Sequence, residues 1–65
     1  MKFDNLHDAL VYHDLYFDSW NSRMAEGKVS WHIHNGGNVV FYGIAADSTA
    51  HAELLALEYL NRLED

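Results

Sequence analysis

The chain contains no cysteine and no proline. Without cysteine it can form neither disulfide bonds nor zinc sites built on thiolates. A domain of 65 residues buries only about 60% of its unfolded surface, and small domains commonly need a disulfide, a metal ion or a partner chain. The remaining options are a well-packed monomer, an oligomer, or a metal site made of histidine and carboxylate. The lack of cysteine also fits an intracellular protein, and we expect a cytoplasmic one.

Basic residues are scarce. Four lysines and arginines stand against ten aspartates and glutamates, which gives a formal charge of −6. This balance argues against direct binding to nucleic acid, because such binding relies on basic side chains that neutralise phosphates. It fits a protein partner with a basic surface, since opposite charges speed the encounter. Solubility is the alternative reason for the same charge.

Long apolar runs are also missing, and no segment approaches the roughly 18 residues that a membrane span needs. The N-terminal stretch MKFDNLHDALVYHD lacks the apolar core of a signal peptide. We therefore expect no membrane association. The apolar content of 49% is too high for a disordered tail, and no repeat or linker divides the chain. The sequence predicts a single compact domain over residues 1–65.

An amphipathic pattern predicts a first helix from about Asp4 to about Glu26. Apolar or aromatic residues recur at alternating spacings of three and four, which places them on one stripe of a helix. The stripe comprises Phe3, Leu6, Leu10, His13, Phe17, Trp20 and Met24. Asp4 or Asn5 can cap the start, and Gly27 suits the C-terminal end. A rival interpretation takes residues 9–17, ALVYHDLYF, as a strand, but its two alternating sets give no clean polar face.

A β-hairpin is predicted where KVSWHIHN and NVVFYGIA flank Gly36 and Gly37. A two-residue loop gives these pairs on one face: Ile33 with Val40, Trp31 with Tyr42 and Val29 with Ile44. It gives these pairs on the other face: His34 with Val39, His32 with Phe41 and Ser30 with Gly43. A three-residue loop would instead bring Trp31 beside Phe41. A slip of one residue exchanges the two faces of one strand, so the register decides which of its side chains face the core.

A last helix is predicted to begin near Asp47, Ser48 or Thr49, which are all good caps, and to run to the end of the chain. Its wide apolar face comprises Ala52, Leu55, Ala56, Tyr59, Leu60 and Leu63. A narrower apolar patch comprises Ala50, Leu54 and Leu57. Two apolar faces indicate two contacts, one with the hairpin and one with the first helix or another chain.

Together these elements predict a small α+β domain in the order α-β-β-α, in which an antiparallel hairpin packs with two amphipathic helices. A sheet of two strands is marginally stable and has open edges, so a homodimer is a further expectation.

The stretch FYGIAADSTAHAELLALEYL resembles the end of a double-stranded-RNA-binding domain, which also finishes with a helix rich in alanine and leucine. The resemblance covers about a third of the chain. Two features depart from that family: its third strand is missing, and DSTAH stands where the family has a lysine-rich start of the final helix. The resemblance implies a shape and carries no function.

Histidine is abundant, with five residues in the chain. His32 and His34 flank Ile33 on a predicted strand, which puts both imidazoles on one face at a spacing that can hold zinc. A third ligand would have to come from elsewhere, for example from His51. The alternative is that the histidines merely follow strand alternation and face water. His13 lies on the apolar stripe and is expected to be a satisfied core histidine, whose burial can make stability depend on pH.

Catalytic patterns are missing. The neighbours His7 and Asp8 point in different directions on a helix, as do His13 and Asp14. There is no cysteine nucleophile, and the serines lie in no nucleophile elbow. The NGGN stretch lacks the strand–loop–helix setting and the lysine of a phosphate-binding loop. We therefore expect neither an enzyme nor a cofactor.

Acidic residues border small apolar groups on both predicted helices. The first helix carries its acids away from the apolar stripe, around Val11 and Leu15, and the last helix borders Leu54 and Leu57 with Glu53, Glu58 and Glu64. An apolar island with a charged rim is typical of a protein interface. Carboxylates one helical turn apart, at about 6 Å, also approximate the spacing of phosphates along a nucleic-acid strand. The alternative is a solvated acidic face whose apolar residues pack inside the fold.

We therefore expect a small acidic protein-binding module, an inhibitor or accessory protein that occupies a basic surface of a nucleic-acid-handling partner, in the manner of a viral antagonist of a host system. The predicted contact residues are Asp4, Asp8, Val11, Asp14, Leu15, Asp18, Glu26, Glu53, Leu54, Leu57 and Glu58. Two alternatives stay open. One is a small-ligand or metal binder that uses the hairpin face of His32, His34 and Phe41, and the other is a structural homo-oligomer.

Overall fold

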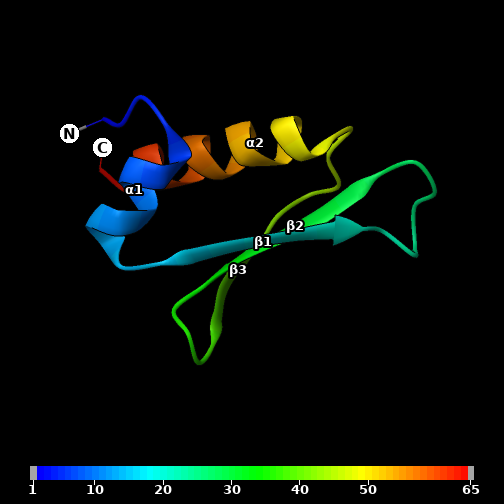
Figure 1. The fold of residues 1–65 in the computed structure, drawn as a ribbon, viewed down its shortest axis with the longest axis horizontal. Coiled ribbons are helices and arrows are strands. Elements are labelled where there is room, and N and C mark those ends of the chain that lie inside the picture. The colour runs from blue at the N-terminus through cyan, green and yellow to red at the C-terminus, as the bar shows by residue number, and fades with distance from the viewer. Residues whose placement is uncertain (1, 65) are drawn as a thin grey trace.

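The computed structural model describes residues 2–64, which form two helices and a three-stranded antiparallel sheet (Figure 1). In chain order the elements are α1 (Leu6–His13), β1 (Tyr16–Asn21), β2 (Val29–His34), β3 (Val39–Tyr42) and α2 (Thr49–Arg62). The predicted α+β class is confirmed, with three strands instead of a hairpin.

The first helix has only eight residues. Asn5 caps its start, because its side-chain oxygen accepts a hydrogen bond from the N–H of Asp8 at 2.9 Å. At the other end Asp14 adopts the left-handed backbone conformation with a φ of 58°, and the N–H of Leu15 donates to the Leu10 carbonyl at 2.9 Å. This conformation ends the helix, and aspartate is one of the few residues besides glycine that adopt it.

The predicted first helix is therefore wrong beyond His13, where the chain continues into β1 and a loop. Half of the residues of β1 are aromatic, which suits a pleated strand, and all of them pair with β2. Phe17 still packs against the core, but from a strand, whereas Met24 is 97% exposed in the loop. Gly27 lies in that loop with a φ of 80° and ends no helix. The rival strand over residues 9–17 overlaps β1 only at its last two residues.

Strand β2 lies between β1 and β3 and pairs antiparallel with both. The pairing with β1 is regular, from Tyr16 opposite His34 to Asn21 opposite Val29. Beyond β3, Val29 forms an isolated antiparallel bridge with Ala46, with both N–H to carbonyl distances at 2.8 Å. The central strand is therefore bonded on both sides along most of its length.

The β2–β3 hairpin contains a bulge just before His34, which neither predicted loop included. The pairing predicted for a two-residue loop holds at His34, which lies opposite Val39, and shifts by one residue beyond the bulge. Phe41 therefore pairs with Ile33 and packs against the core, so its predicted place on the histidine face is wrong. Trp31 and Phe41 are not register partners, but their rings lie beside each other with centroids 5.7 Å apart, as the three-residue loop would place them.

Two local features hold this register. The Asn35 side-chain oxygen accepts hydrogen bonds from the N–H groups of Gly37 and Asn38, which closes the loop. Just after β3, the N–H of Gly43 donates to the Trp31 carbonyl at 3.0 Å. A Cβ atom at position 43 would lie 1.8 Å from the Trp31 indole, so the close approach of this ring requires glycine.

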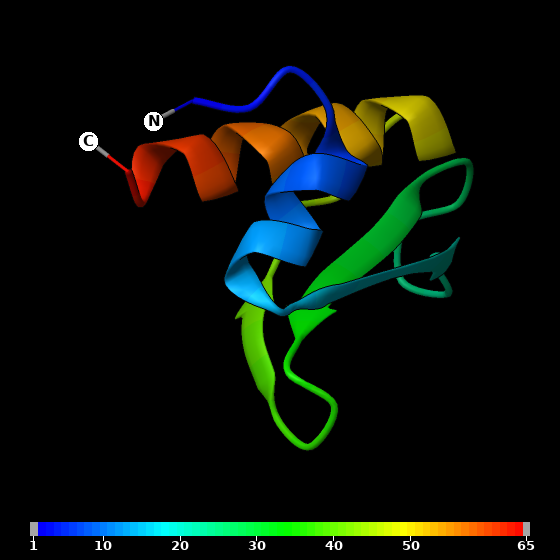
Figure 2. The ribbon, with the colours of Figure 1, turned by 60° about the vertical axis from the view of Figure 1, so that its left-hand side comes forward.

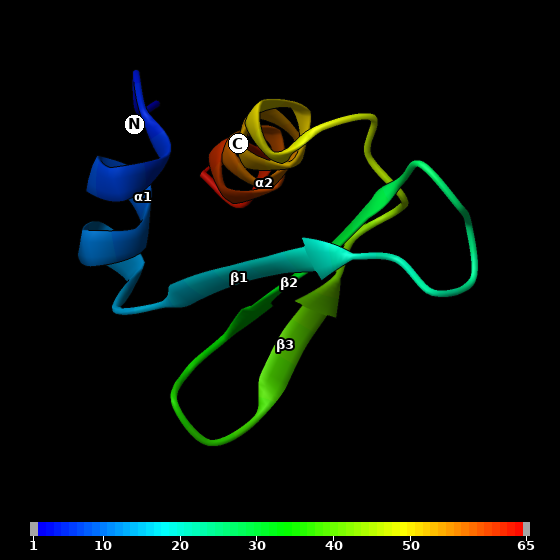
Figure 3. The ribbon, with the colours of Figure 1, turned by 45° about the vertical axis from the view of Figure 1, so that its right-hand side comes forward.

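Helix α2 begins where the sequence predicted and lies on the same side of the sheet as α1 (Figures 2 and 3). The Ser48 side chain caps it by accepting from the N–H of His51. Small side chains on the inner face of α2 allow close packing on β2 and α1. The buried core comprises Ala9, Trp31, Ile33, Ala46, Ala52, Ala56 and Leu60.

The two predicted faces of the last helix have different outcomes. The wide face packs inward as expected, except that Leu63 is half exposed at the end of the helix. In the narrow patch, Leu57 packs against the core whereas Leu54 is exposed. The helix ends at Arg62, short of the predicted end, and Asp65 lies outside the described residues. Within residues 2–64, neither helix is long and apolar enough to cross a membrane.

Candidate metal centre on the open face of the sheet

Both helices cover one face of the sheet and leave the other face open (Figure 3). Because side chains alternate along a strand, the burial of Trp31 and Ile33 on the helix side places His32 and His34 on the open side. On the neighbouring strand, Asp18 is the register partner of His32. Strand alternation and one cross-strand pair thus bring two imidazoles and a carboxylate together.

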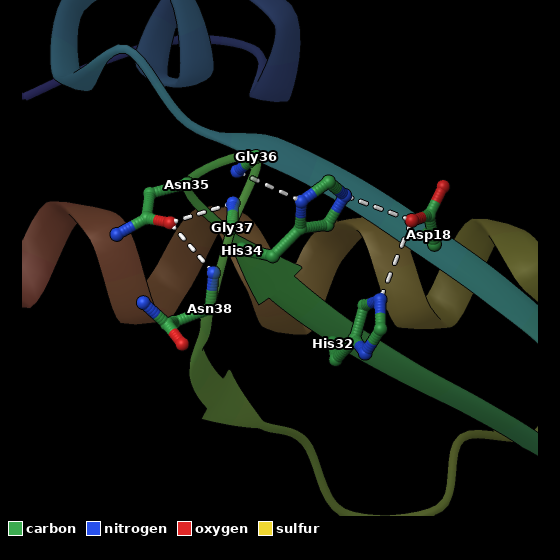
Figure 4. A network of polar contacts seen from close by, with 7 residues as sticks. All are labelled: Asp18, His32, His34, Asn35, Gly36, Gly37 and Asn38. Atoms are coloured by element: carbon green, nitrogen blue, oxygen red, sulfur yellow. Dashed lines mark hydrogen bonds and ion pairs between the residues drawn. The ribbon is translucent and has the colours of Figure 1, made fainter.

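Asp18 lies at the centre of this cluster (Figure 4). Its Oδ2 atom is 2.9 Å from Nε2 of His34 and 3.3 Å from Nε2 of His32. The histidine side chains are 26% and 20% exposed, respectively, and that of Asp18 is 60% exposed. The sheet therefore encloses most of each imidazole, while the carboxylate faces solvent.

The three residues offer one donor atom each, and these atoms lie within 4.8 Å of one another. Zinc binds imidazole nitrogen at about 2.0–2.1 Å and carboxylate oxygen at about 2.0–2.2 Å, so a tetrahedral site separates its donors by roughly 3.3 Å. The distance between Asp18 and His32 already has this value, and the shorter one to His34 needs only a small lengthening. Three protein ligands leave the fourth position of a tetrahedral ion open.

Aromatic rings from the two outer strands surround the cluster. Tyr16 stacks on His34 with ring centroids 5.3 Å apart. Trp20 and Tyr42 approach His32 edge-on, at centroid distances of 5.0 and 6.0 Å. These contacts restrict the rotation of both imidazoles, and all three aromatic side chains remain exposed to solvent.

His34 has a second contact, with the hairpin turn. The N–H of Gly36 donates to Nδ1 of His34 at 3.1 Å (Figure 4). Because Nδ1 accepts this hydrogen bond, a neutral His34 carries its proton on Nε2 and donates it to Asp18. The cluster is therefore a hydrogen-bonded network that runs from β1 through β2 to the turn.

His51, which the sequence suggested as a third zinc ligand, has a different role. Its Nδ1 accepts a hydrogen bond from the N–H of Asp47 at 3.0 Å, and its own N–H donates to Ser48 Oγ at 3.1 Å. This arrangement is similar to a capping box at the start of α2, except that the His51 ring accepts from the residue before the cap. Among the described residues the ligand group consists of Asp18, His32 and His34, so the suggestion of His51 is corrected.

Asp18 was not predicted as a metal ligand, because the helical apolar spacing placed it on a helix and not on a strand beside His32. Asp18 and His32 are 14 residues apart, and no local spacing relates them. A strand interpretation of residues 16–21 would have given the signal, since it places Asp18 on the same face as Tyr16 and Trp20.

The acids predicted to share one face of the first helix are distributed over several elements. They occupy the start of α1 (Asp4 and Asp8), the residue that ends it (Asp14), the open sheet face (Asp18) and the β1–β2 loop (Glu26). Between them, Val11 is 66% exposed, but Leu15 packs against the core. The structure therefore does not join these residues into one helical stripe.

On α2 the predicted contact residues remain closer together. Glu53 and Glu58 are exposed, as is Leu54, whereas Leu57 is partly buried against the core. Each predicted apolar island thus keeps one exposed member, Val11 on α1 and Leu54 on α2.

His13 is mostly buried, as expected, with an 18% exposed side chain that contacts the rings of Phe3 and Tyr12. Its Nε2 atom has no hydrogen-bond partner among the described residues and lies 3.5 Å from a carboxylate oxygen of Glu64. The expectation of a satisfied core histidine therefore fails at Nε2, which has the Glu64 carboxylate beside it but no hydrogen bond.

A separate ion pair connects the segment before α2 to the residue before β2. The Lys28 ammonium group donates to a carboxylate oxygen of Asp47, beside the bridge between Val29 and Ala46. The hydrogen bond and the positive charge of Lys28 lower the pKa of Asp47 below its usual value.

Comparison of the chain with protein-family models, curated proteins and solved structures found no significant match. The resemblance of residues 41–60 to a double-stranded-RNA-binding domain is therefore supported by no relative.

Proposed function

We propose that this protein binds a divalent metal ion of the zinc type through Asp18, His32 and His34. The observation that supports the proposal is the convergence of three donor atoms on the open face of the sheet. Imidazole and carboxylate groups are ligands that zinc commonly takes in proteins. Paired strands hold these donors, which makes their geometry more precise than that of a loop site.

A metal ion at this position would cross-link β1 and β2 on the face that no helix covers. Small domains commonly use such an ion to supplement a limited core. The Asp18 side chain is 60% exposed, so water or a donor from another molecule could reach an ion held there. The arrangement suits a metal-binding module with an accessible ion.

Isothermal titration calorimetry with ZnCl₂ tests this proposal on the full chain. The wild type should bind one zinc ion. Asp18→Ala, His32→Ala and His34→Ala should each weaken binding by more than the roughly 10–100-fold that the loss of an outer-shell partner costs. His51→Ala is the matched control, because it removes a histidine that lies outside the ligand group.

Two results would contradict the proposal. One is the absence of a binding heat in the wild type together with an unchanged melting temperature. The other is an equal loss of affinity in His51→Ala, which would show that zinc binds to histidines in general.

A second candidate is the acidic protein-binding module expected from the sequence, which would occupy a basic surface of a nucleic-acid-handling partner without contacting nucleic acid. The observation that favours it is the exposure of one apolar residue beside acids on each helix. Val11 lies one helical turn after Asp8, and Leu54 lies one turn before Glu58. Such residues can anchor a contact, while the carboxylates guide the approach of a basic partner.

Affinity capture from the native host followed by mass spectrometry tests this candidate. A basic protein should be retained by the wild type and by Leu63→Ser, and lost with Leu54→Ser, which removes the exposed residue between the acids of α2. Leu63 is a suitable control because it is an exposed leucine near the end of the same helix. Equal capture by all three baits would remove this surface from consideration.

A further inference from the structure

The hairpin turn over residues 35–38 is bonded directly to one of the proposed metal ligands. The connection is the hydrogen bond from the Gly36 N–H to Nδ1 of His34. We propose that metal occupancy of the site is transmitted to this turn through His34. The inference rests on the proposed function and specifies how the same site acts, as a metal-responsive switch.

A neutral imidazole ring carries a single proton on one of its two nitrogens. In the metal-free protein Nδ1 accepts from Gly36, so the proton is on Nε2 and points to Asp18. A metal ion needs the lone pair of Nε2 and therefore displaces this proton. The ring stays neutral when the proton moves to Nδ1 through solvent, and no proton is gained or lost overall.

This proton shift affects the hydrogen bond that the Gly36 N–H donates to His34. With its proton on Nδ1, the His34 ring presents a donor to the backbone N–H, and two donors cannot share a hydrogen bond. A metal-bound histidine usually gives its second N–H to a carbonyl, a carboxylate or water. The hydrogen bond between Gly36 and His34 must therefore break when the metal binds.

Gly36 is the turn residue that can move when this bond breaks, because Asn35 still bonds to Gly37 and Asn38. Two consecutive glycines, Gly36 and Gly37, lie at the tip of the turn, and Gly36 already has a φ of 94°. Glycine permits backbone rotation at little steric cost. The four turn residues are all exposed, so a rearrangement displaces water and no packed side chain. The metal-bound and metal-free proteins would thus present different surfaces at the hairpin tip.

His32 provides the internal comparison. Its Nε2 atom lies 3.3 Å from the same carboxylate oxygen that His34 contacts, and its other contacts are with the rings of Trp20, His34 and Tyr42. When the ring proton of His32 moves between its nitrogens, no backbone hydrogen bond among the described residues breaks. The effect on the turn is therefore specific to His34.

NMR of the ¹⁵N-labelled full chain, without and with ZnCl₂, tests the inference. In the metal-free protein the ring nitrogen shifts should show an unprotonated Nδ1 at His34. With zinc, Nδ1 should be protonated, and the amide of Gly36 should exchange with solvent about fivefold faster, as expected for the loss of one ordinary hydrogen bond.

Two variants separate this effect from general loosening of the sheet. In the metal-free state, His34→Ala should accelerate Gly36 exchange to the rate of the zinc-loaded wild type, whereas His32→Ala should leave it slow. Equal acceleration in both variants would overturn the inference.

The inference and the proposed function can fail separately. If calorimetry shows zinc binding but Nδ1 of His34 stays unprotonated and Gly36 stays protected, the switch is overturned and the metal site stands. If calorimetry shows no binding, both are overturned.

Discussion

Single residues at the centre of the sheet decide both the site and the stability of the fold. His32 and His34 share the open face because Trp31 and Ile33 are buried on the other side. This part of the site was predictable, since a strand of alternating residues is a local pattern. The contribution of Asp18 was not, because it depends on the pairing of β1 with β2.

Gly43 is expected to be intolerant of any side chain. A Cβ atom there would lie 1.8 Å from the Trp31 indole, which is held by a hydrogen bond from Nε1 to the Ile44 carbonyl. Gly43→Ala should lower the free energy of unfolding by about 1–3 kcal/mol, the usual cost of overpacking a core. Urea denaturation followed by tryptophan fluorescence measures this change.

The matched control for this substitution is Gly37→Ala. A Cβ at position 37 would lie 3.7 Å from the nearest atom, an ordinary contact, so its effect should stay within about 0.5 kcal/mol. An equal loss of unfolding free energy in both variants would show that the Trp31 ring moves aside to make room for a methyl group at position 43.

The ion pair of Lys28 with Asp47 predicts a dependence of stability on acid pH. The pKa of Asp47 is lowered from 3.8 by the hydrogen bond and charge of Lys28. Because the folded pKa lies below the unfolded one, this stabilisation is present above pH 3.8 and is lost as the pH falls through the lower, folded value. Thermal unfolding of the wild type and Lys28→Gln at several pH values should show a difference that shrinks on acidification. A difference that is constant with pH would contradict this assignment.

Among the helices and strands, the largest difference from the sequence prediction is that α1 ends at His13 and β1 begins at Tyr16. The apolar spacing of residues 3–24 satisfies a helical stripe, yet the chain changes direction at Asp14. A helix gains only local hydrogen bonds, whereas β1 gains a full set of pairs with β2 and buries Phe17 against Trp31. These long-range partners outweigh the helical periodicity, and no window of local sequence contains them.

The stability of variants at position 14 should therefore depend on how easily the new residue adopts the left-handed backbone conformation, and less on its charge. Asp14→Val should destabilise the protein by about 1–2 kcal/mol, because a β-branched residue is strained in the left-handed region. Asp14→Gly should be neutral or stabilising, since glycine adopts this conformation freely. Circular dichroism during chemical denaturation measures both variants. Equal stability of the valine and glycine variants would show that residue 14 does not carry the strain.

At the scale of the whole molecule, two helices cover one side of the sheet and nothing among the described residues covers the other (Figure 3). Zinc binding on that open side should therefore stabilise the entire domain. At a free zinc concentration 100 times its dissociation constant, the gain is about 2.7 kcal/mol. For a domain of this size the melting temperature should rise by roughly 10–20 °C.

Differential scanning calorimetry with and without ZnCl₂ measures this shift. Asp18→Ala should lose it and His51→Ala should retain it. A rise of equal size in Asp18→Ala would place the zinc ion elsewhere. The homodimer expected from the open strand edges remains a separate prediction, and sedimentation of a concentration-independent monomer would contradict it.

Local patterns in the sequence predicted the α+β class, the capped start of the last helix, the inward face that carries Trp31 and Ile33, and the place of two histidines on one face. Each of these follows from periodicity or capping, which act over a few neighbouring residues. The strand β1, the bulge in the hairpin and the position of Asp18 beside the histidine pair became clear only from the folded chain. These depend on contacts between segments far apart in the chain, whose energies no local pattern contains.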